Sequence, residues 1–337
     1  MTQSPAPATA RTTAGNSRAA GLPGLDIVIV NWNAGALLSD CISSMAGIEQ
    51  KAFRIGQVVV VDNASTDGSA DRLDGLAGGN IPLEVVHNSA NRGFAAACNQ
   101  GAARGTGDWI LFLNPDTRLF ADSLDRAMAF ASADPTIGAL GIALVDATGE
   151  RQRSCARTPT PVRLVAQSIG LDRLLPGVFP PHFMTGWDHA DTRDVDQVMG
   201  AFLMIPRPLF ERLGGFDERY FVYFDDVDLC LCVRQAGYRV VHYAGATAFH
   251  QGCGTTDGVR DRRLFYSLRS RLLFTAKHYG PLARLAVSMA TLIAEPLSRL
   301  AQAVLRRSPA DAGAVLRGTG MLWRDLPGIL PVLFRSR

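Results

Sequence analysis

Several patterns that would define common protein classes are missing from this 337-residue sequence. Its six cysteines form no C-x-x-C pair and have no zinc-like spacing, which excludes a redox dithiol or a structural zinc site as the default interpretation. Residues 1–20 contain no apolar segment of the kind found in a secretory signal. We therefore expect reduced, mostly buried cysteines, a disordered tail over residues 1–23 and a cytoplasmic protein.

Two nucleotide-binding motifs and any long apolar run are also lacking. No G-x-G-x-x-G follows the first expected strand, which argues against a Rossmann dehydrogenase, and no G-x-x-x-x-G-K-[ST] occurs anywhere. The longest uncharged, largely apolar stretch near the C-terminus, residues 285–294, is far shorter than the roughly 20 residues of a membrane span. We expect no transmembrane helix.

Charge is distributed unevenly along the chain. Residues 259–337 hold fourteen Arg or Lys against four acids, a net +10, so the remainder carries −7 of the overall +3. Such a segment favours contact with an anionic surface, either membrane headgroups or nucleic acid. Its charges alternate with apolar residues and it has no nucleic-acid-reading motif, so we expect a peripheral membrane attachment and no nucleic acid. The alternative is a helical cap on the preceding domain.

Short β-branched runs alternate with longer mixed segments from residue 25 onward, which indicates βαβ units and a largely parallel sheet. The strands expected first cover residues 26–30, 57–61, 83–86 and 109–113. Helices are expected at 37–45, 69–76, 94–104, 122–131, 206–213 and 226–236, further strands at 137–145, 197–205 and 238–243, and a loop over an acceptor site at 158–194. The first four strands end in polar residues, which are Asn31, Asp62, His87 and Asn114. The carboxyl ends of parallel strands share one rim of a sheet, where ligands bind.

Two segments near this rim suit a nucleotide. VVVVDNASTDG at 58–68 places Asp62 and Asn63 after a buried strand, where a carboxylate can accept from a pyrimidine N–H and a turn offers backbone N–H groups. NRGFAAACNQG at 91–101 begins with Asn91, Arg92 and Gly93, in which the arginine can meet a diphosphate and the glycine permits close approach. Both segments can also be read as ordinary turns and helix starts.

Carboxylates dominate the remaining candidates. In WILFLNPDT at 109–117, Asn114 and Asp116 flank a rigid proline, and Asp116 is the expected ligand of Mg2+ or Mn2+, with Asn114 acting through water or the sugar. Asp225 and Asp226 are adjacent in an apolar setting that raises one pKa toward that of a general base, although Asp228 is close and all three acids also suit a helix start. His250 can complete a metal site as neutral imidazole.

Taken together, these segments resemble the family 2 inverting glycosyltransferases of the GT-A fold. The resemblance covers roughly residues 26–252 and rests on IVIVNWN at 27–33, VVDNASTDGS at 60–69, NRGFAAACNQG, FLNPDT at 112–117 and GGFDERYFVYFDDVDLCLCVRQAGY at 214–238. Within the family the sequence is most similar to bacterial rhamnosyltransferases of cell-wall and O-antigen assembly. The implied architecture is a GT-A catalytic domain over residues 24–256 and a basic helical region over 257–337.

The resemblance also implies roles for individual residues. Asn31, Asn33 and Asp62 would contact the nucleoside, Asp116 and His250 would bind the cation, and Asp226 would be the catalytic base. The implied reaction moves rhamnose from dTDP-rhamnose to a hydroxyl of a glycan or of a sugar on a polyprenyl diphosphate. The alternatives are another donor such as a UDP-sugar, or a non-catalytic nucleotide- or nucleic-acid-binding α/β protein. In this chain Asn114 replaces the first acid of the family's D-x-D, and Asp225-Asp226 replaces its usual Glu-Asp.

Overall fold

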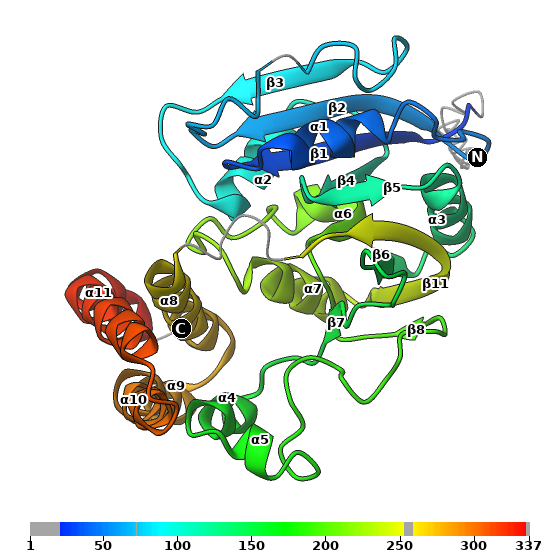
Figure 1. The fold of residues 1–337 in the computed structure, drawn as a ribbon. Coiled ribbons are helices and arrows are strands. Elements are labelled where there is room, and N and C mark those ends of the chain that lie inside the picture. The colour runs from blue at the N-terminus through cyan, green and yellow to red at the C-terminus, as the bar shows by residue number, and fades with distance from the viewer. Residues whose placement is uncertain (1–20, 72, 253–258, 335–337) are drawn as a thin grey trace, which may run out of the picture.

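The computed structural model describes residues 21–71, 73–252 and 259–334. Its first four strands run parallel in the order β3-β2-β1-β4 (Figure 1). They are β1 (Gly24–Asn31), β2 (Arg54–Asp62), β3 (Leu83–His87) and β4 (Trp109–Leu113). In this register Asn31 lies opposite Asp62, and Asp62 opposite His87. The strands and their common polar rim are therefore as the sequence predicts.

The other half of the sheet is mixed, where the sequence indicated largely parallel strands. β10 (Phe202–Pro206) runs antiparallel to both β4 and β6 (Ile137–Val145), and β11 (Arg239–His250) is parallel to β6. Two short strands, β5 (Thr117–Leu119) and β8 (Arg193–Asp194), pair antiparallel with β11. The expected strand at 197–205 is divided into β9 (Gln197–Val198), which pairs with β7 (Cys155–Ala156), and β10. The break occurs where the Gly200 N–H donates to Asp226 instead of to a strand.

Helices cover both faces of the sheet because alternate strand residues point to opposite sides. Ile27 and Ile29 pack on the side of α1 (Ala36–Ser43) and α3 (Ser123–Ser132). Val28 and Val30 pack on the side of α2 (Phe94–Ala102), α6 (Arg207–Arg212) and α7 (Asp225–Gln235). These helices match the sequence predictions to within a few residues at each end. The described cysteines are unpaired, and all but Cys232 are buried, as expected; Cys253 lies outside the described residues.

Two sequence predictions about local structure are wrong. The helix expected at 69–76 is replaced by turns in its described residues. Asp67 Oδ1 accepts from the Ser69 N–H and hydroxyl, which forms a local turn, and Gly75 adopts a left-handed φ of 78°. The segment 158–194 is partly helical, with α4 (Pro161–Ser168) and α5 (Leu171–Leu174). Thr160 caps α4 by accepting from the Arg163 N–H at 3.4 Å, and Pro161 occupies a favoured first position.

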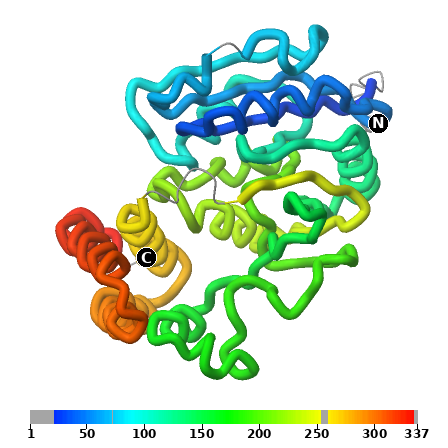
Figure 2. The backbone as a smooth tube through the Cα atoms, viewed as in Figure 1, coloured from blue at the N-terminus to red at the C-terminus, as the bar shows by residue number. Residues whose placement is uncertain are grey.

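The C-terminal region forms helices to one side of the sheet's carboxyl rim (Figures 1 and 2). They are α8 (Arg260–His278), α9 (Pro281–Met289), a π-helical turn η1 (Ala290–Ala294), α10 (Glu295–Leu305) and α11 (Pro309–Phe334). α8 and α11 share an apolar cluster with Tyr220 and Val227 of the preceding domain. The region therefore packs on that domain. The boundary expected at 256/257 lies outside the described residues, as does the tail expected over 1–23 except for residues 21–23, which form no helix or strand. Among the described helices, none is long and apolar enough to cross a bilayer.

Candidate active site

Asp62 is held at the end of β2 by its neighbour on β1. The Asn31 Nδ2 donates to Asp62 Oδ1 at 2.8 Å, and the Ser65 N–H donates to Oδ2 at 3.2 Å. Asn31 is fully buried, and its amide also lies 3.0 Å and 2.8 Å from the hydroxyls of Ser65 and Ser69. Asn31 therefore fixes the orientation of Asp62.

The loops after β1 and β2 are joined by short polar side chains. Asn33 has a left-handed φ of 52°, and its Oδ1 accepts from the Thr66 N–H at 2.7 Å. In return the Asn33 N–H donates to Ser65 Oγ at 2.9 Å, and the Gly35 N–H donates to Asp67 Oδ2 at 2.9 Å. Asn favours this backbone region because its side chain can bond locally. The two loops therefore form one rigid rim around Asp62.

The segment 91–93 is fixed from both sides. Asn63 Nδ2 donates to the Gly93 carbonyl at 3.0 Å, and Asn91 Oδ1 accepts from the Gly93 N–H at 2.9 Å. Gly93 has φ 87°, and a Cβ there would lie 2.4 Å from the Phe221 carbonyl oxygen. Gly93 therefore lets the backbone at Phe221 approach closely. The Phe221 carbonyl accepts from the Phe94 N–H at 2.6 Å. Arg92 is exposed beside this contact.

Asp116 and His250 are distant in sequence and are brought together by the pairing of β5 with β11, in which Thr117 lies opposite His250. His250 Nε2 lies 3.4 Å from Asp116 Oδ1, and both side chains are almost fully buried. Gln152 donates through Nε2 to the His250 carbonyl at 2.6 Å, so its Oε1 faces His250 Nδ1 at 2.7 Å and accepts from it. The Nδ1 proton is thereby fixed, which leaves the Nε2 lone pair directed at the carboxylate.

This arrangement fits a divalent cation. An imidazole lone pair and a carboxylate oxygen that face each other at 3.4 Å repel unless a proton or a cation lies between them. The carboxylate oxygen suits Mg2+ or Mn2+, and the imidazole nitrogen, with Gln152 as its partner, favours Mn2+ over the harder Mg2+. Asn114 is placed nearby on the same turn, and its carbonyl accepts from the Thr117 N–H at 3.1 Å.

Asp225 and Asp226 open α7 after an unusual backbone turn. Tyr223 and Phe224 both have φ 66°, a left-handed conformation that is costly for bulky residues and that places the two acids at the helix start. Asp226 accepts from the Gly200 N–H at 3.0 Å and from the Val227 N–H at 2.8 Å. Burial raises the pKa of both acids, and the like charge of Asp226 raises the pKa of Asp225 further.

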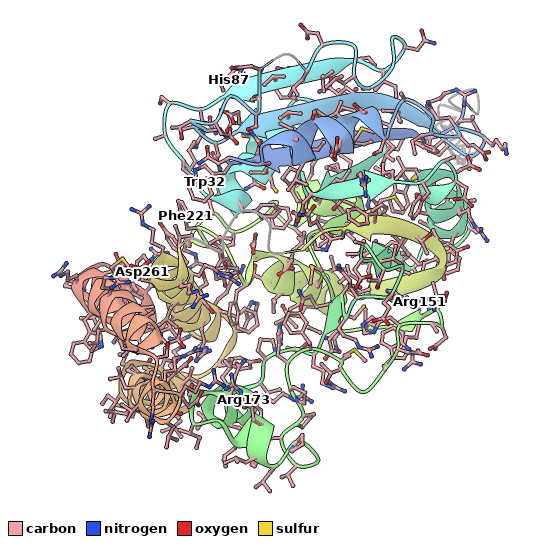
Figure 3. The ribbon with its side chains drawn as sticks, in the orientation of Figure 1. Trp32, His87, Arg151, Arg173, Phe221 and Asp261 are labelled. Carbon is pink, nitrogen blue, oxygen red and sulfur yellow. The ribbon has the colours of Figure 1, made fainter. Side chains whose placement is uncertain are left out.

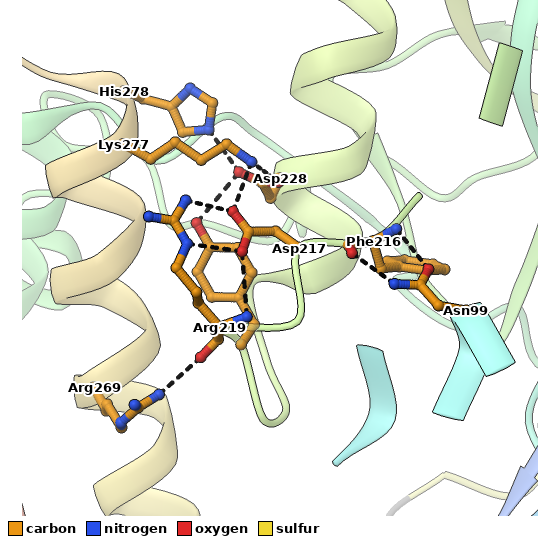
Figure 4. Close-up of polar contacts among 9 residues, drawn as sticks. Asn99, Phe216, Asp217, Arg219, Asp228, Arg269, Lys277 and His278 are labelled. Carbon is orange, nitrogen blue, oxygen red and sulfur yellow. Dashed lines mark hydrogen bonds and ion pairs between the residues drawn. The ribbon is translucent and has the colours of Figure 1, made fainter. Parts of the chain in front are cut away.

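Asp228 is separated from this pair by its partners. Its carboxylate accepts from Lys277 Nζ at 2.6 Å, His278 Nε2 at 2.7 Å and the Tyr220 hydroxyl at 3.2 Å (Figure 4). With Cys232 and His278 it has the spacing of a metal site, but the Lys277 ammonium already supplies the positive charge there. Asp228 therefore joins α7 to α8 and is not free to take a proton from a substrate.

Two adjoining cavities connect these groups. One, of 820 Å³, is bordered by Asp116 and His250 and is named the Asp116 cavity; the other, of 490 Å³, is bordered by Asp225 and Asp226 and is named the Asp226 cavity. Both are lined by Phe94, Asn114, Met199, Val222, Tyr223 and Arg263. The two groups of acids therefore face one continuous hollow between the sheet rim and α8. Trp32 and Phe221 border it on the Asp116 side (Figure 3).

Not every predicted residue borders the hollow. Asn63, Asn91, Gly93 and Asn114 line the Asp116 cavity, whereas Asn31, Asn33, Asp62 and Arg92 line neither. Sequence reasoning missed Gln152 and Gly200, which position His250 and Asp226. It also missed Arg263 and Arg271 of α8, which line the Asp226 cavity; Arg271 is paired with the buried Glu295. The net charge of the C-terminal segment was the only signal for these arginines, and it does not indicate which of them face the site.

Comparison with solved structures identifies the fold. A mannosyltransferase from Pyrobaculum calidifontis, solved with GDP-mannose and Mn2+, matches 93% of this chain and 85% of its own, with a TM-score of 0.52 at 22% identity. The fold is thus the GT-A fold of nucleotide-sugar transferases, in which a central sheet is combined here with C-terminal helices.

Sequence comparison then gives the family. Residues 26–211, more than half of the chain, match the family model of glycosyl transferase family 2, and the chain belongs to this family. It is 28% identical over 277 residues to an N-acetylglucosaminyl-diphospho-decaprenol L-rhamnosyltransferase of Mycobacterium tuberculosis, covering 76% of this chain and 85% of the relative. A low-salt glycan biosynthesis hexosyltransferase of Haloferax volcanii is 23% identical, covering 75% of each chain. The protein is a glycosyltransferase.

Proposed function

We propose that this glycosyltransferase moves rhamnose from dTDP-rhamnose to a hydroxyl of a sugar carried on a polyprenyl diphosphate, in the synthesis of a cell-envelope polysaccharide. The observation that carries the proposal is the continuous hollow, with a candidate cation site at one end and a pair of buried acids with raised pKa values at the other. The mycobacterial relative, whose name states this donor sugar and a lipid-diphosphate acceptor, supports the choice of substrates.

The nucleotide end of the donor belongs at the sheet rim. Asp62, oriented by Asn31, accepts from an N–H of the base, and the two joined loops that contain Asn33 and Asn63 border the ribose. Asn91 and Gly93 line the Asp116 cavity, where the diphosphate would lie. Asp116 and His250 would hold Mg2+ or Mn2+, which supplies positive charge to the leaving diphosphate when bound.

Asp226 is the proposed base because its carboxylate faces the Asp226 cavity and is fixed by two backbone N–H groups. It takes the proton of the acceptor hydroxyl while that oxygen forms a bond to the anomeric carbon. The bond between the anomeric carbon and the diphosphate oxygen breaks on the opposite face, so the configuration inverts. A raised pKa makes Asp226 a stronger base than an ordinary aspartate.

The decisive experiment offers the purified protein a panel of dTDP-, UDP- and GDP-sugars with Mg2+ or Mn2+ and a lipid-diphosphate-linked N-acetylglucosamine. Product mass identifies the sugar that is transferred, and NMR of the new linkage reports inversion or retention. We expect transfer from dTDP-rhamnose with inversion, abolished by a chelator and by Asp226→Asn. Transfer only from a UDP- or GDP-sugar would overturn the donor assignment, and absence of transfer from every donor would overturn the acceptor class.

The basic C-terminal helices support a location on the cytoplasmic face of a membrane, where a polyprenyl-linked acceptor and anionic headgroups are both found. Recovery of the native protein with membranes, and its release by high salt, would test this attachment. A protein found only in the soluble fraction at low salt would contradict it.

A further inference from the structure

Exposed apolar side chains are concentrated at one end of the molecule. Among the described residues eighteen large apolar side chains are exposed, and thirteen of these belong to two segments, residues 162–183 and 282–305. A soluble protein normally scatters such residues, and a concentrated patch indicates an interaction surface. Packing within the described residues leaves these apolar side chains exposed, so the patch indicates a surface that binds something else.

The second segment carries its apolar residues along one side of a continuous helical rod. Leu282, Leu285, Met289, Ile293 and Leu297 follow one another at spacings of three or four residues across α9, η1 and α10. This spacing places them on one face. Leu282 is 85% exposed, and Leu305, at the far end of the rod, is 84% exposed. From Leu282 to Leu297 the stripe extends over ~22 Å, and the rod as far as Leu305 over ~35 Å, at 1.5 Å per residue.

The first segment lies against this rod. α4 packs against α9 and η1, and Arg173 Nη1 donates to Gln302 Oε1 of α10 at 3.1 Å. In Figure 1 α4 and α5 lie beside α9 and α10 at the end of the molecule away from the strands of the sheet's parallel half. Leu174, next to Arg173 in α5, and Val178, shortly after α5, are 74% and 69% exposed. The two segments together, residues 161–183 and 281–308, are named the α4–α10 face.

The charge of the α4–α10 face is positive. It holds six arginines and two acids, and one of the acids, Glu295, is buried between Arg271 and Arg299. Arg306 and Arg307 are exposed directly after the stripe, where side chains of this length reach past apolar neighbours. Apolar residues flanked by arginine complement the surface of an anionic bilayer.

The α4–α10 face is continuous with the wall of the active site. Leu164 and Gln167 of α4 line the Asp226 cavity, and Phe183 both lines that cavity and is exposed. A molecule held in the bilayer surface against α4 is therefore close to the side of the cavity that contains Asp226. The functional value of this nearness rests on the proposed function, in which the acceptor is lipid-linked. The presence of the apolar and basic surface does not depend on that proposal.

We propose that the α4–α10 face is a docking surface for an anionic lipid bilayer and that the segment 161–183 contributes to it together with the C-terminal helices. The bilayer receives the stripe of α9–α10 and the apolar residues of α5, while Arg306 and Arg307 contact its headgroups. In this orientation the Asp226 cavity opens toward the membrane surface.

The test is cosedimentation with vesicles of phosphatidylcholine alone or with phosphatidylglycerol. We expect binding to the anionic vesicles, reduced by about tenfold or more in the double variant Leu282→Asp/Leu305→Asp and in Leu174→Asp/Val178→Asp, since each inserts charge into the apolar face. The matched control is Leu22→Asp/Phe120→Asp, which adds the same charge at exposed apolar positions elsewhere and should bind like wild type. Arg306→Gln/Arg307→Gln should lose the preference for phosphatidylglycerol.

Equal binding by all variants would overturn the proposal. So would a concentration-dependent dimer, detected by sedimentation, that the Leu282→Asp/Leu305→Asp variant abolishes while vesicle binding is unchanged, because the face would then bind a second copy. Thermal melts check that each variant is folded. Vesicle binding requires no turnover, so a failed transfer assay with intact lipid binding rejects the proposed function alone. Normal transfer to a detergent-solubilised acceptor without lipid binding rejects the docking face alone.

Discussion

The Asp116 cavity and the Asp226 cavity are built in different ways. The rim beside the first is formed largely by loops that directly follow parallel strands, and short side chains such as Asn31, Asn33 and Ser65 join neighbouring loops. The second collects Pro159, Gly200, Asp226 and Arg271 from four separate parts of the chain. The comparison teaches that the rim around Asp62 is set by neighbouring strand ends, whereas the Asp226 cavity, like the His250 side of the Asp116 cavity, depends on packing between distant segments.

The largest expected effect separates the two acids of the Asp226 cavity. Asp226→Asn should lower kcat by ~10³-fold, since a positioned base contributes 10² to 10⁴. Asp225→Asn should cost far less, because Asp225 is buried more deeply and Asp226 is the acid held by Gly200. Steady-state rates with unchanged nucleotide affinity would check this. The reverse order of the two losses would assign the base to Asp225.

Asp228→Asn should act on stability and not on chemistry. Asn keeps one acceptor oxygen but loses the charge that pairs with Lys277 and bonds His278, so we expect a loss of about 2–3 kcal/mol in the free energy of unfolding. Chemical denaturation measures the loss, and kcat per folded molecule should remain within a few fold. A large fall in kcat without loss of stability would place Asp228 in the reaction.

Gln152→Ala tests how the Asp116 cavity is supported. Without the amide that fixes Nδ1, His250 is free to rotate and to change tautomer, and we expect Mn2+ affinity to fall by about 10- to 100-fold. Titration calorimetry of the metal with a nucleoside diphosphate measures this, and Gln152→Glu, which retains the acceptor, should recover most of the affinity. Unchanged metal affinity in Gln152→Ala would mean that His250 needs no such support.

The smallest effect concerns pH. A base must be unprotonated, so activity should rise with pH through an apparent pKa above that of an ordinary aspartate. Burial and then the like charge of Asp226 raise the pKa of Asp225 to about 8, which means that Asp226 ionises while Asp225 is still protonated and neutral. Asp225→Asn therefore removes no charge at that stage and should leave the acidic limb of kcat/KM close to its wild-type position. A limb that moves clearly to lower pH would show that Asp225 ionises first and that its charge raises the pKa of Asp226.

The sequence by itself determined the parallel half of the sheet and the shared rim of its polar strand ends. Apolar runs such as 57–61 must be buried on both faces, and parallel strands must end at a common rim, so Asn31, Asp62, His87 and Asn114 were expected there. The strand order, which makes Asn31, Asp62 and His87 neighbours, came from the structure. The acids at 225 and 226 were recognised for a similar local reason, since they begin a helix in an apolar setting.

Only the tertiary structure decided which groups share a cavity. Asp228 lies only two residues from Asp226, yet Lys277 and His278, about fifty residues away, remove it from the site. Nothing in the sequence around Gln152 indicates a role for it, and only the position of β11 places His250 beside it. Local sequence sets strand and helix type through short-range sterics and burial, whereas long-range pairing depends on how whole elements pack, which no short window of residues encodes.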